Sequence, residues 1–311
     1  MAENIGPAIV ARDLTKRFGD FTAVDHIDFE VGAAEAFGFL GPNGAGKTST
    51  MRMIGCASPV TEGTLRVAGM DPAASASEIK ARLGVVPQIN NLDNELSVSE
   101  NLLMYARYFH IAKSEARAKT QELLEFMQLS DRAKDKVEPL SGGMKRRLII
   151  ARALINDPSI ILLDEPTTGL DPQARHLVWD RLYRLKQRGV TLVITTHYMD
   201  EAEQLCDRLV VMDKAKVVAE GTPRGLIERH VTREVVELRL PDESRSSLNG
   251  FLETVARRVE HLPDRILLYA DDGEHALSLI HSRGIAMQSA LVRRASLEDV
   301  FLGLTGHTLI D

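Results

Sequence analysis

Short, strongly apolar runs alternate with helix-like segments over the first two thirds of the chain. Five of these runs are predicted strands, at residues 36–40, 83–86, 159–163, 191–195 and 209–212. Several are apolar almost throughout, which is typical of strands buried on both faces of a sheet. Strands that alternate with helical segments predict an α/β fold with a mostly parallel sheet covered by helices.

The pattern changes between residues 90 and 156. Strand-like runs disappear there, and apolar residues recur at helical spacing, as in the segments SVSENLLMYARYFHIA and ARAKTQELLEFMQL. We interpret this stretch as a helical insert in the α/β domain, which extends over residues 8–230.

A second, smaller domain is predicted after the turn-rich residues 220–223 and a short helix that ends near His230. The composition also changes, because the last lysine is Lys216. Ser296 and Asp299 have the spacing of a capping box, whose third residue is usually Glu or Gln. We expect a small α+β domain over residues 231–311, with strands at 234–240, 265–270 and 285–292 and helices at 246–259, 274–283 and after residue 296.

Composition narrows the class of protein. The chain has 311 residues, 44% hydrophobic and 26% charged, and its apolar runs are far shorter than the roughly 20 residues that span a bilayer. The first residues lack the pattern of a secretory signal, and the two cysteines, Cys56 and Cys206, cannot form a disulfide framework, so we expect a cytoplasmic location. The net charge of −6 argues against a nucleic-acid partner.

The clearest chemical signal is the segment GPNGAGKTS, which matches the P-loop pattern GxxxxGK[ST] between a predicted strand and a predicted helix. Glycines let the backbone curl so that its N–H groups surround a phosphate at a helix N-terminus. We expect Lys47 to contact the β- and γ-phosphates, Thr48 to bind Mg²⁺ and Ser49 to reach the α-phosphate. The predicted ATP-binding segment is Gly41, Pro42, Asn43, Gly44, Ala45, Gly46, Lys47, Thr48 and Ser49.

A second signal is the apolar run SIILLDEPTTGLD, which ends in two carboxylates. At the carboxyl end of a parallel strand, Asp164 would lie beside the P-loop and hold Mg²⁺. Glu165 follows directly, where it can orient or deprotonate the water that attacks the γ-phosphate.

The third signal is the run LSGGMKRR at residues 140–147, and with it the chain resembles the ATP-binding subunits of ABC transporters. Ser141, Gly142 and Gly143 begin a predicted helix and would present a hydroxyl and free N–H groups to an anion. The basic residues that follow, 145–147, are expected to form a solvated helix face. The resemblance implies the ABC ATPase fold, a P-loop NTPase fold in which an antiparallel β edge and the helical insert join the parallel sheet.

The resemblance also implies the roles of further residues. It implies a head-to-tail homodimer in which Ser141–Gly143 of one subunit close over the ATP of the other. Gln88 would contact Mg²⁺ and water, and Asp171 would signal between the two sites. His197 would contact the γ-phosphate in catalysis, with Glu165 and Lys47, and Phe18 would stack on adenine, where tyrosine is commoner.

Two stretches, residues 85–113 and 195–212, resemble the ATPase subunits of drug, polysaccharide and lipo-oligosaccharide exporters, including the nodulation-factor exporters. The run ASLEDVFLGLTG resembles the end of the accessory domain in antibiotic exporters of the daunorubicin type. Such subunits hydrolyse ATP on the inner face of the cell membrane and pair with a separate ABC-2-type permease. The alternative is a soluble ABC ATPase that acts on ribosomes or DNA; such proteins usually carry two cassettes or long coiled-coil insertions, which this sequence lacks.

Overall fold

The computed structural model describes residues 6–241 and 250–306. The chain forms two compact units, Met1–Glu220 and Gly221–Asp311, each described by itself below. We expected the boundary one helix later, at residue 230. Helix α8 (Pro223–His230) packs against α12 (Leu297–Thr305) and therefore goes with the second unit.

A six-stranded sheet forms the centre of the first unit, in the order β5-β6-β7-β3-β8-β9. The five predicted strands occur with ends that differ by at most one residue, and neighbouring members of this set pair in parallel. Every residue of β3 and β7 is buried, which agrees with the scarcity of charged residues on both faces of these strands. The strands are β3 (Ala36–Leu40), β5 (Leu83–Val86), β6 (Ile160–Asp164), β7 (Thr191–Thr196), β8 (Arg208–Asp213) and β9 (Lys216–Gly221).

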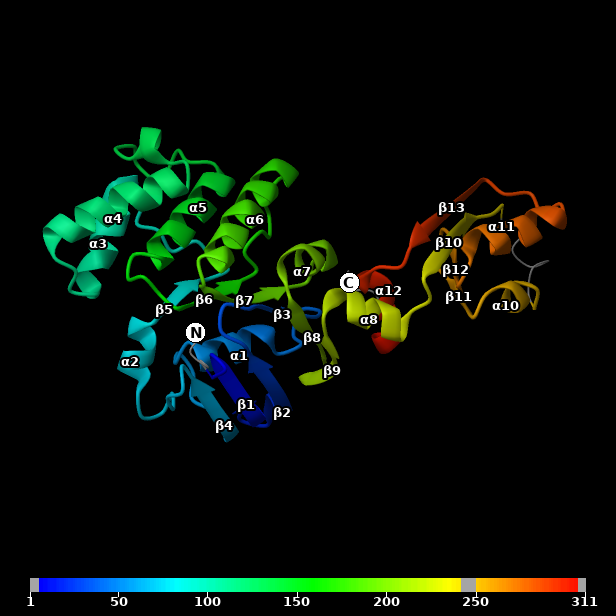
Figure 1. The fold of residues 1–311 in the computed structure, drawn as a ribbon, viewed down its shortest axis with the longest axis horizontal. Helices are drawn as coiled ribbons and strands as arrows, with labels where there is room; N and C mark the ends of the chain where they lie inside the picture. Colours follow the sequence, from blue (N-terminus) through cyan, green and yellow to red (C-terminus); the bar gives the residue numbers. More distant parts are fainter. Residues whose placement is uncertain (1–5, 242–249, 307–311) are drawn as a thin grey trace, which may run out of the picture. The chain divides into compact units, whose positions relative to one another are not determined.

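A three-stranded antiparallel sheet, in the order β2-β1-β4, supplies the expected antiparallel part of the fold. Its strands are β1 (Ile9–Phe18), β2 (Phe21–Val31) and β4 (Glu62–Val67). Helix α1 (Lys47–Ile54) contacts β2 of this sheet and β6 and β7 of the larger one, as Figure 1 shows. The ring of Phe29 packs edge-on against Phe39 with centroids 5.0 Å apart, so the core joins the two sheets.

The chain between β5 and β6 forms the helices of the insert, which gather at one end of this unit (Figure 1). They are α3 (Val98–Tyr108), α4 (Lys113–Phe126), the short 3-10 helix η1 (Ser130–Arg132) and α5 (Gly142–Ala153). Ser97 and Glu100 cap α3, since each backbone N–H donates to the side chain of the other. Helix α2 (Ala76–Ala81) precedes β5, and α6 (Pro172–Gln187) and α7 (Met199–Leu205) follow β6 and β7.

The second unit is an α+β fold, as expected. Its four strands form an antiparallel sheet in the order β11-β12-β10-β13. Helices α10 (Leu252–Val255) and α11 (Gly273–Ser282) cover one face through a core that includes Val236 and Leu268. On the other face Tyr269 packs with Leu302 of α12. The strands are β10 (Glu234–Arg239), β11 (Arg258–His261), β12 (Ile266–Ala270) and β13 (Ser289–Arg294).

One element of this unit was predicted wrongly. The helix expected over residues 246–259 begins outside the described residues, and within them α10 ends at Val255. Residues 258–261 form strand β11 instead, with Val259 opposite Leu268 of β12. Pairing with the edge of the sheet outweighs the helical pattern of the segment. The strand expected at 285–292 begins later, at Ser289.

The backbone N–H of Ser296 donates to Asp299 Oδ2 over 2.8 Å at the start of α12, as the capping-box spacing predicts. Over residues 6–241 and 250–306, the structure contains no helix long and apolar enough to cross a membrane.

Candidate nucleotide site

The glycine-rich loop at residues 41–49 joins β3 to α1 and is packed too tightly for larger residues. A Cβ atom at Gly41 would lie 2.2 Å from the carbonyl oxygen of Met212, and one at Gly46 would lie 2.4 Å from that of Ala23. Gly46 also has a φ of +103°, which side chains disfavour. The loop therefore reaches the start of α1 by a path that only glycine permits, and the first N–H groups of α1 lack intrahelical partners.

Lys47 lies folded into this loop with only 5% of its surface exposed. Its Nζ donates to the carbonyl oxygens of Gly41 at 2.6 Å and Pro42 at 2.9 Å. Burial lowers the pKa of Lys47, and the nearby Glu165 and Asp164 act in the opposite direction. A cation beside free N–H groups at a helix start is suited to bind a phosphate chain.

Asp164 and Thr48 bring oxygen ligands together. Asp164 ends β6 opposite Thr195 of β7, so the parallel sheet places both at the edge where the loop leaves β3. Thr48 Oγ1 lies 3.4 Å from Asp164 Oδ1, which also accepts a hydrogen bond from Thr195. Hydroxyl and carboxylate oxygens are the ligands that Mg²⁺ prefers, so this donor set fits the expected metal.

Side chains that follow the neighbouring strands lie around the Glu165 carboxylate. It is 8% exposed, and its φ of +46° is unusual for a residue with a side chain. Its Oε2 accepts from Gln88 Nε2 at 3.0 Å and from Thr168 Oγ1 at 3.1 Å. The Nδ1 atom of His197 lies 3.2 Å from Oε1, without the alignment of a hydrogen bond.

Ser141, Gly142 and Gly143 begin α5, and Ser141 and Gly142 are exposed. A Cβ atom at Gly143 would lie 2.7 Å from that of Ala174, so this segment lies beside the start of α6. Asp171 caps α6 there by accepting from the N–H of Ala174 at 2.9 Å. Ser141, Gly142 and Gly143, called the signature segment from here on, thus lie beside Asp171.

Phe18 ends β1 with 50% of its surface exposed, and Lys16 Nζ lies 4.8 Å from its ring centroid. Side-chain contacts and the charge interactions of Lys47 join the other expected residues into one cluster at the sheet edge: Lys47, Thr48, Gln88, Asp164, Glu165 and His197.

The expectation that residues 145–147 form a solvated helix face was wrong for Arg146, which is 7% exposed. Its guanidinium donates to four backbone carbonyl oxygens, and burial lowers the pKa of Arg146 to about 10. The signal was present in the sequence, since position 146 precedes the buried Ile149 and Ile150 by three and four residues and so shares their helix face.

Glu201 on α7 was also missed. It is 1% exposed and accepts hydrogen bonds from Thr167 Oγ1 at 2.6 Å and Trp179 Nε1 at 3.3 Å. Burial raises the pKa of this carboxyl group. No local sequence pattern marks Glu201, because its partners lie on other elements.

Comparisons with known proteins agree with this geometry. The family described as "ABC transporter" matches residues 24–168. The "Nod factor export ATP-binding protein I" of Burkholderia lata is 46% identical over 301 residues, covering 96% of this chain and 97% of the relative. The chain belongs to the ATP-binding subunits of ABC transporters. The Rhizobium meliloti protein of the same name is 46% identical to this ABC subunit over 305 residues, 98% of this chain and 90% of the relative.

Other matches cover each part of the ABC subunit. The family described as "Nodulation factor export protein NodI, C-terminal domain" matches residues 243–306. A dimeric post-hydrolysis state of the ATP-binding cassette MJ0796 bound to ADP and Pi matches with a TM-score of 0.63 and 28% identity, over 69% of this chain and 98% of that one. The ADP conformation of the cassette MJ1267 matches with a TM-score of 0.66 and 26% identity, over 72% and 94%. The subunit is thus an ABC-type ATPase with a nucleotide-binding cassette fold.

Proposed function

We propose that this chain is the ATP-hydrolysing subunit of an ABC exporter and drives a lipo-oligosaccharide cargo of the Nod factor kind through a separate ABC-2-type permease. The observation that carries the proposal is similarity to Nod factor export ATP-binding proteins over nearly the full length of both chains. That similarity does not favour the alternative of an ATPase acting on ribosomes or DNA.

The chain would bind ATP through the loop at residues 41–49. Its N–H groups would surround the phosphates, Lys47 would exchange its bonds to Gly41 and Pro42 for bonds to phosphate, and Ser49 would reach the α-phosphate. The half-exposed ring of Phe18 offers a face for adenine. Thr48, Asp164 and Gln88 would hold Mg²⁺, which when bound supplies positive charge that neutralises the phosphates.

Glu165 would serve as the base or orienting group for the attacking water. Its position between Gln88, Thr168 and His197 limits its movement, and low exposure excludes competing solvent. His197 stands on the opposite carboxylate oxygen from Gln88, where it would contact the γ-phosphate and hold the carboxylate in place. Positioning and electrostatics of this kind account for most catalysis of phosphoryl transfer.

A second subunit would complete the site. Ser141, Gly142 and Gly143 would present the start of α5 to the ATP held by the partner, and Asp171 beside them would respond to that contact. Dimeric cassettes among the similar solved structures support this arrangement. Differential contact with the γ-phosphate would then favour the closed dimer until hydrolysis.

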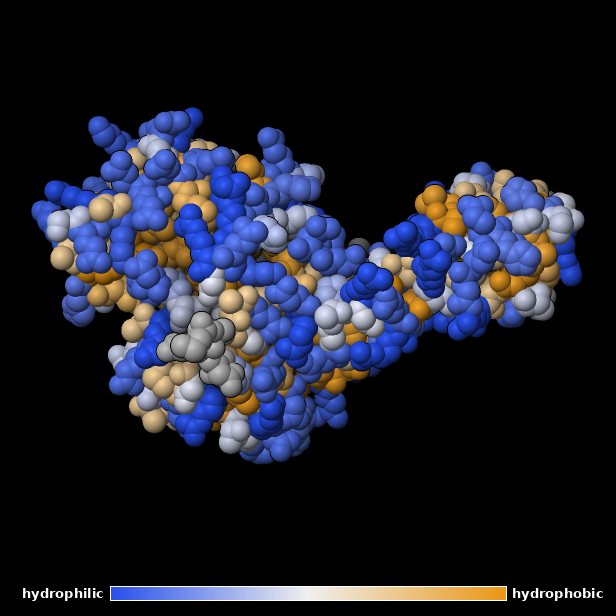
Figure 2. Space-filling model, in the orientation of Figure 1, coloured by the Kyte–Doolittle hydropathy of each residue, from blue (hydrophilic) through white to orange (hydrophobic). Residues whose placement is uncertain are grey.

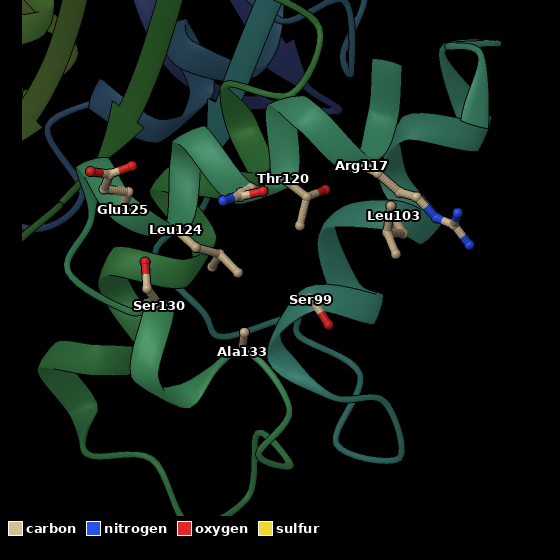
Figure 3. A pocket seen from close by; sticks show the side chains of 9 residues that line it. Ser99, Leu103, Arg117, Thr120, Leu124, Glu125, Ser130 and Ala133 are labelled. Carbon is tan, nitrogen blue, oxygen red and sulfur yellow. The ribbon is translucent and has the colours of Figure 1, made fainter. Parts of the chain in front are cut away.

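The permease would dock on the helical insert. A pocket with a cavity volume of about 380 Å³ lies between α3, α4 and η1 (Figure 3). Leu103 and Leu124 line it, and the Thr120 hydroxyl, which lacks a hydrogen-bond partner among the described residues, lies at its wall. An apolar side chain with an adjacent hydrogen-bonding group, on a cytoplasmic loop of the permease, would suit this lining.

Exposed hydrophobic residues between β5 and the end of α3 also favour docking to a membrane protein. Four large hydrophobic residues are exposed on the segment from β5 to α3, and Figure 2 shows hydrophobic residues reaching the surface of the insert among hydrophilic ones. They are Val85, Ile89, Met104 and Tyr108. We place the subunit on the cytoplasmic face of the cell membrane, held there by the permease.

The test is ATP-driven transport. The chain is reconstituted in vesicles with a candidate ABC-2-type permease, and uptake of a labelled lipo-oligosaccharide is measured with ATP and with ADP. ATP-dependent uptake that needs both proteins supports the proposal. Equal uptake without this chain, or its co-purification with ribosomes in place of the permease, would contradict it.

A further inference from the structure

Arg146 links four backbone positions that belong to two motifs. Its Nε donates to the carbonyl oxygen of Pro166 at 2.6 Å, and its Nη2 donates to those of Asp164 at 2.9 Å and Glu165 at 3.0 Å. Its Nη1 donates to the carbonyl oxygen of Pro87 at 2.5 Å, next to Gln88. One guanidinium therefore holds the backbone on both sides of the hydrogen bond between Gln88 and Glu165.

Arg146 also has a dedicated acidic environment. The carboxylates of Glu201, Asp164 and Glu165 stabilise its charge against burial. Glu201 itself accepts from Thr167, which follows Pro166 in the chain. Arg146 and Glu201 thus both hold the turn after β6, Arg146 through backbone carbonyl groups and Glu201 through the Thr167 hydroxyl. Removing either side chain would leave its buried partners without their hydrogen bonds or charge partner.

Arg146 stands on α5, the helix whose first residues form the signature segment. We propose that Arg146 is a positioning residue that sets Gln88 and Glu165 of its own subunit, so that α5 transmits contact with the partner's ATP to the hydrolytic carboxylate of its own chain. This inference rests on the head-to-tail dimer proposed above. It assigns Arg146 an effect in cis, whereas the signature segment on the same helix acts in trans.

Mixed dimers separate these two effects. Two differently tagged chains are co-expressed, and dimers that carry both tags are purified in the presence of ATP. The reference dimer pairs a wild-type chain with a Glu165→Gln chain, so only one subunit can hydrolyse. Arg146→Lys is then placed either on the hydrolysing chain or on the Glu165→Gln chain. Lysine keeps the positive charge and cannot donate to four carbonyl groups in a fixed plane.

On the hydrolysing chain, Arg146→Lys should lower kcat about tenfold or more with little change in KM, because misplacement of the reacting groups is costly. On the Glu165→Gln chain, it should leave the rate within about twofold of the reference dimer, a margin that is small beside the effect of misplacement. The reverse pattern would show that Arg146 only supports the signature segment. Equal losses in both arrangements would show a general structural role. Either result would overturn the inference.

Further variants separate a failure of the Arg146 inference from a failure of the proposed ATP-hydrolysing dimer. Arg181 is also buried, at 7% exposure, and contacts Asp180 and the ring of Phe126, neither of which is a residue of the nucleotide site. Arg181→Lys should leave both arrangements at the reference rate. If Arg146→Lys does not fold, Glu201→Gln should show the same dependence on the hydrolysing chain, and its absence there would equally contradict the inference. A reference dimer that neither forms nor hydrolyses ATP would refute the proposed function itself.

Discussion

Gln88 Nε2 donates a 3.0 Å hydrogen bond to Glu165 Oε2. Gln88 follows β5 at the entry to the helical insert, and Glu165 follows β6, the strand paired in parallel with β5. The carboxyl ends of these strands therefore lie side by side at one edge of the sheet. Because of this bond, any movement of the insert would alter the surroundings of the carboxylate that we assign to hydrolysis.

Replacing Gln88 by alanine should remove the hydrogen bond that joins the Glu165 carboxylate to the start of the insert. We expect kcat for ATP hydrolysis to fall about tenfold while ATP affinity changes little, because Gln88 positions Glu165 and the P-loop stays intact. Steady-state ATPase assays and binding of a fluorescent ATP analogue measure the two quantities. Gln187→Ala, on the exposed end of α6, is the matched control. A loss of affinity equal to the loss of kcat would contradict this assignment.

Glu165→Gln keeps the size of the side chain and removes its ability to take a proton. The ATPase rate should fall about 100-fold or more. ATP binding should persist, so the variant should form a dimer in ATP that is visible by size-exclusion chromatography. Glu78→Gln, on the exposed face of α2, should behave as wild type. A Glu165→Gln protein that hydrolyses ATP at the wild-type rate would remove Glu165 from the mechanism.

Lys47→Ala tests the phosphate site. Removing the buried amine should weaken ATP binding about 100-fold, since it deletes a charged contact in a site of low exposure. Equilibrium binding of ATP gives the affinity, and circular dichroism establishes that the fold survives. Lys80→Ala, an exposed substitution on α2, serves as the comparison. Undiminished affinity in Lys47→Ala would exclude the lysine from the site.

Asp299 in the second unit should make stability depend on pH. Burial alone would raise the pKa of its carboxyl group, but Arg293 and Ser296 outweigh that effect and lower the pKa. Arg293 donates to both carboxylate oxygens, at 2.7 and 2.9 Å. A lowered folded-state pKa stabilises the fold above the ordinary value near pH 4, and this stabilisation is lost as the pH falls through the folded-state value.

Asp299→Asn should therefore lower the free energy of unfolding by about 2 kcal/mol at pH 7, because it removes a charged partner of Arg293, which then keeps only its ion pair with Glu237. The difference from wild type should shrink as the pH falls below about 4. Thermal denaturation of both proteins from pH 7 to below about pH 4 measures this difference in stability. Asp271→Asn breaks an exposed ion pair with Arg257 and should have little effect. A difference that grows in acid would refute the assignment.

Much of the fold and of the candidate site was predictable because its signals are local. The strands of the central sheet are short apolar runs, and a glycine-rich loop between a strand and a helix has few other uses. Asp164 and Glu165 follow such a run directly, so their place at the sheet edge follows from the parallel order of the strands. Ser296 and Asp299 formed the predicted cap for the same reason, since both partners lie within one turn.

Other features depend on partners that lie far away in the chain. Residues 258–261 became a strand because the edge of β12 was open to pair with them. Arg146 looked like part of a basic surface, yet carbonyl groups from residues 87 and 164–166 surround it. Glu201 accepts hydrogen bonds from Thr167 and Trp179, which lie outside its own helix.

The sequence by itself therefore determined the chemistry available to this protein: a loop for phosphate, two carboxylates at a strand end and a signature segment at a helix start. Each is a contiguous run whose residue types and spacing express one local geometry. Only the tertiary structure decided how these parts are joined, namely that Gln88 touches Glu165 and that one arginine of α5 holds the backbone beside both. Such links form when the sheet and the insert pack together, and packing depends on the whole chain.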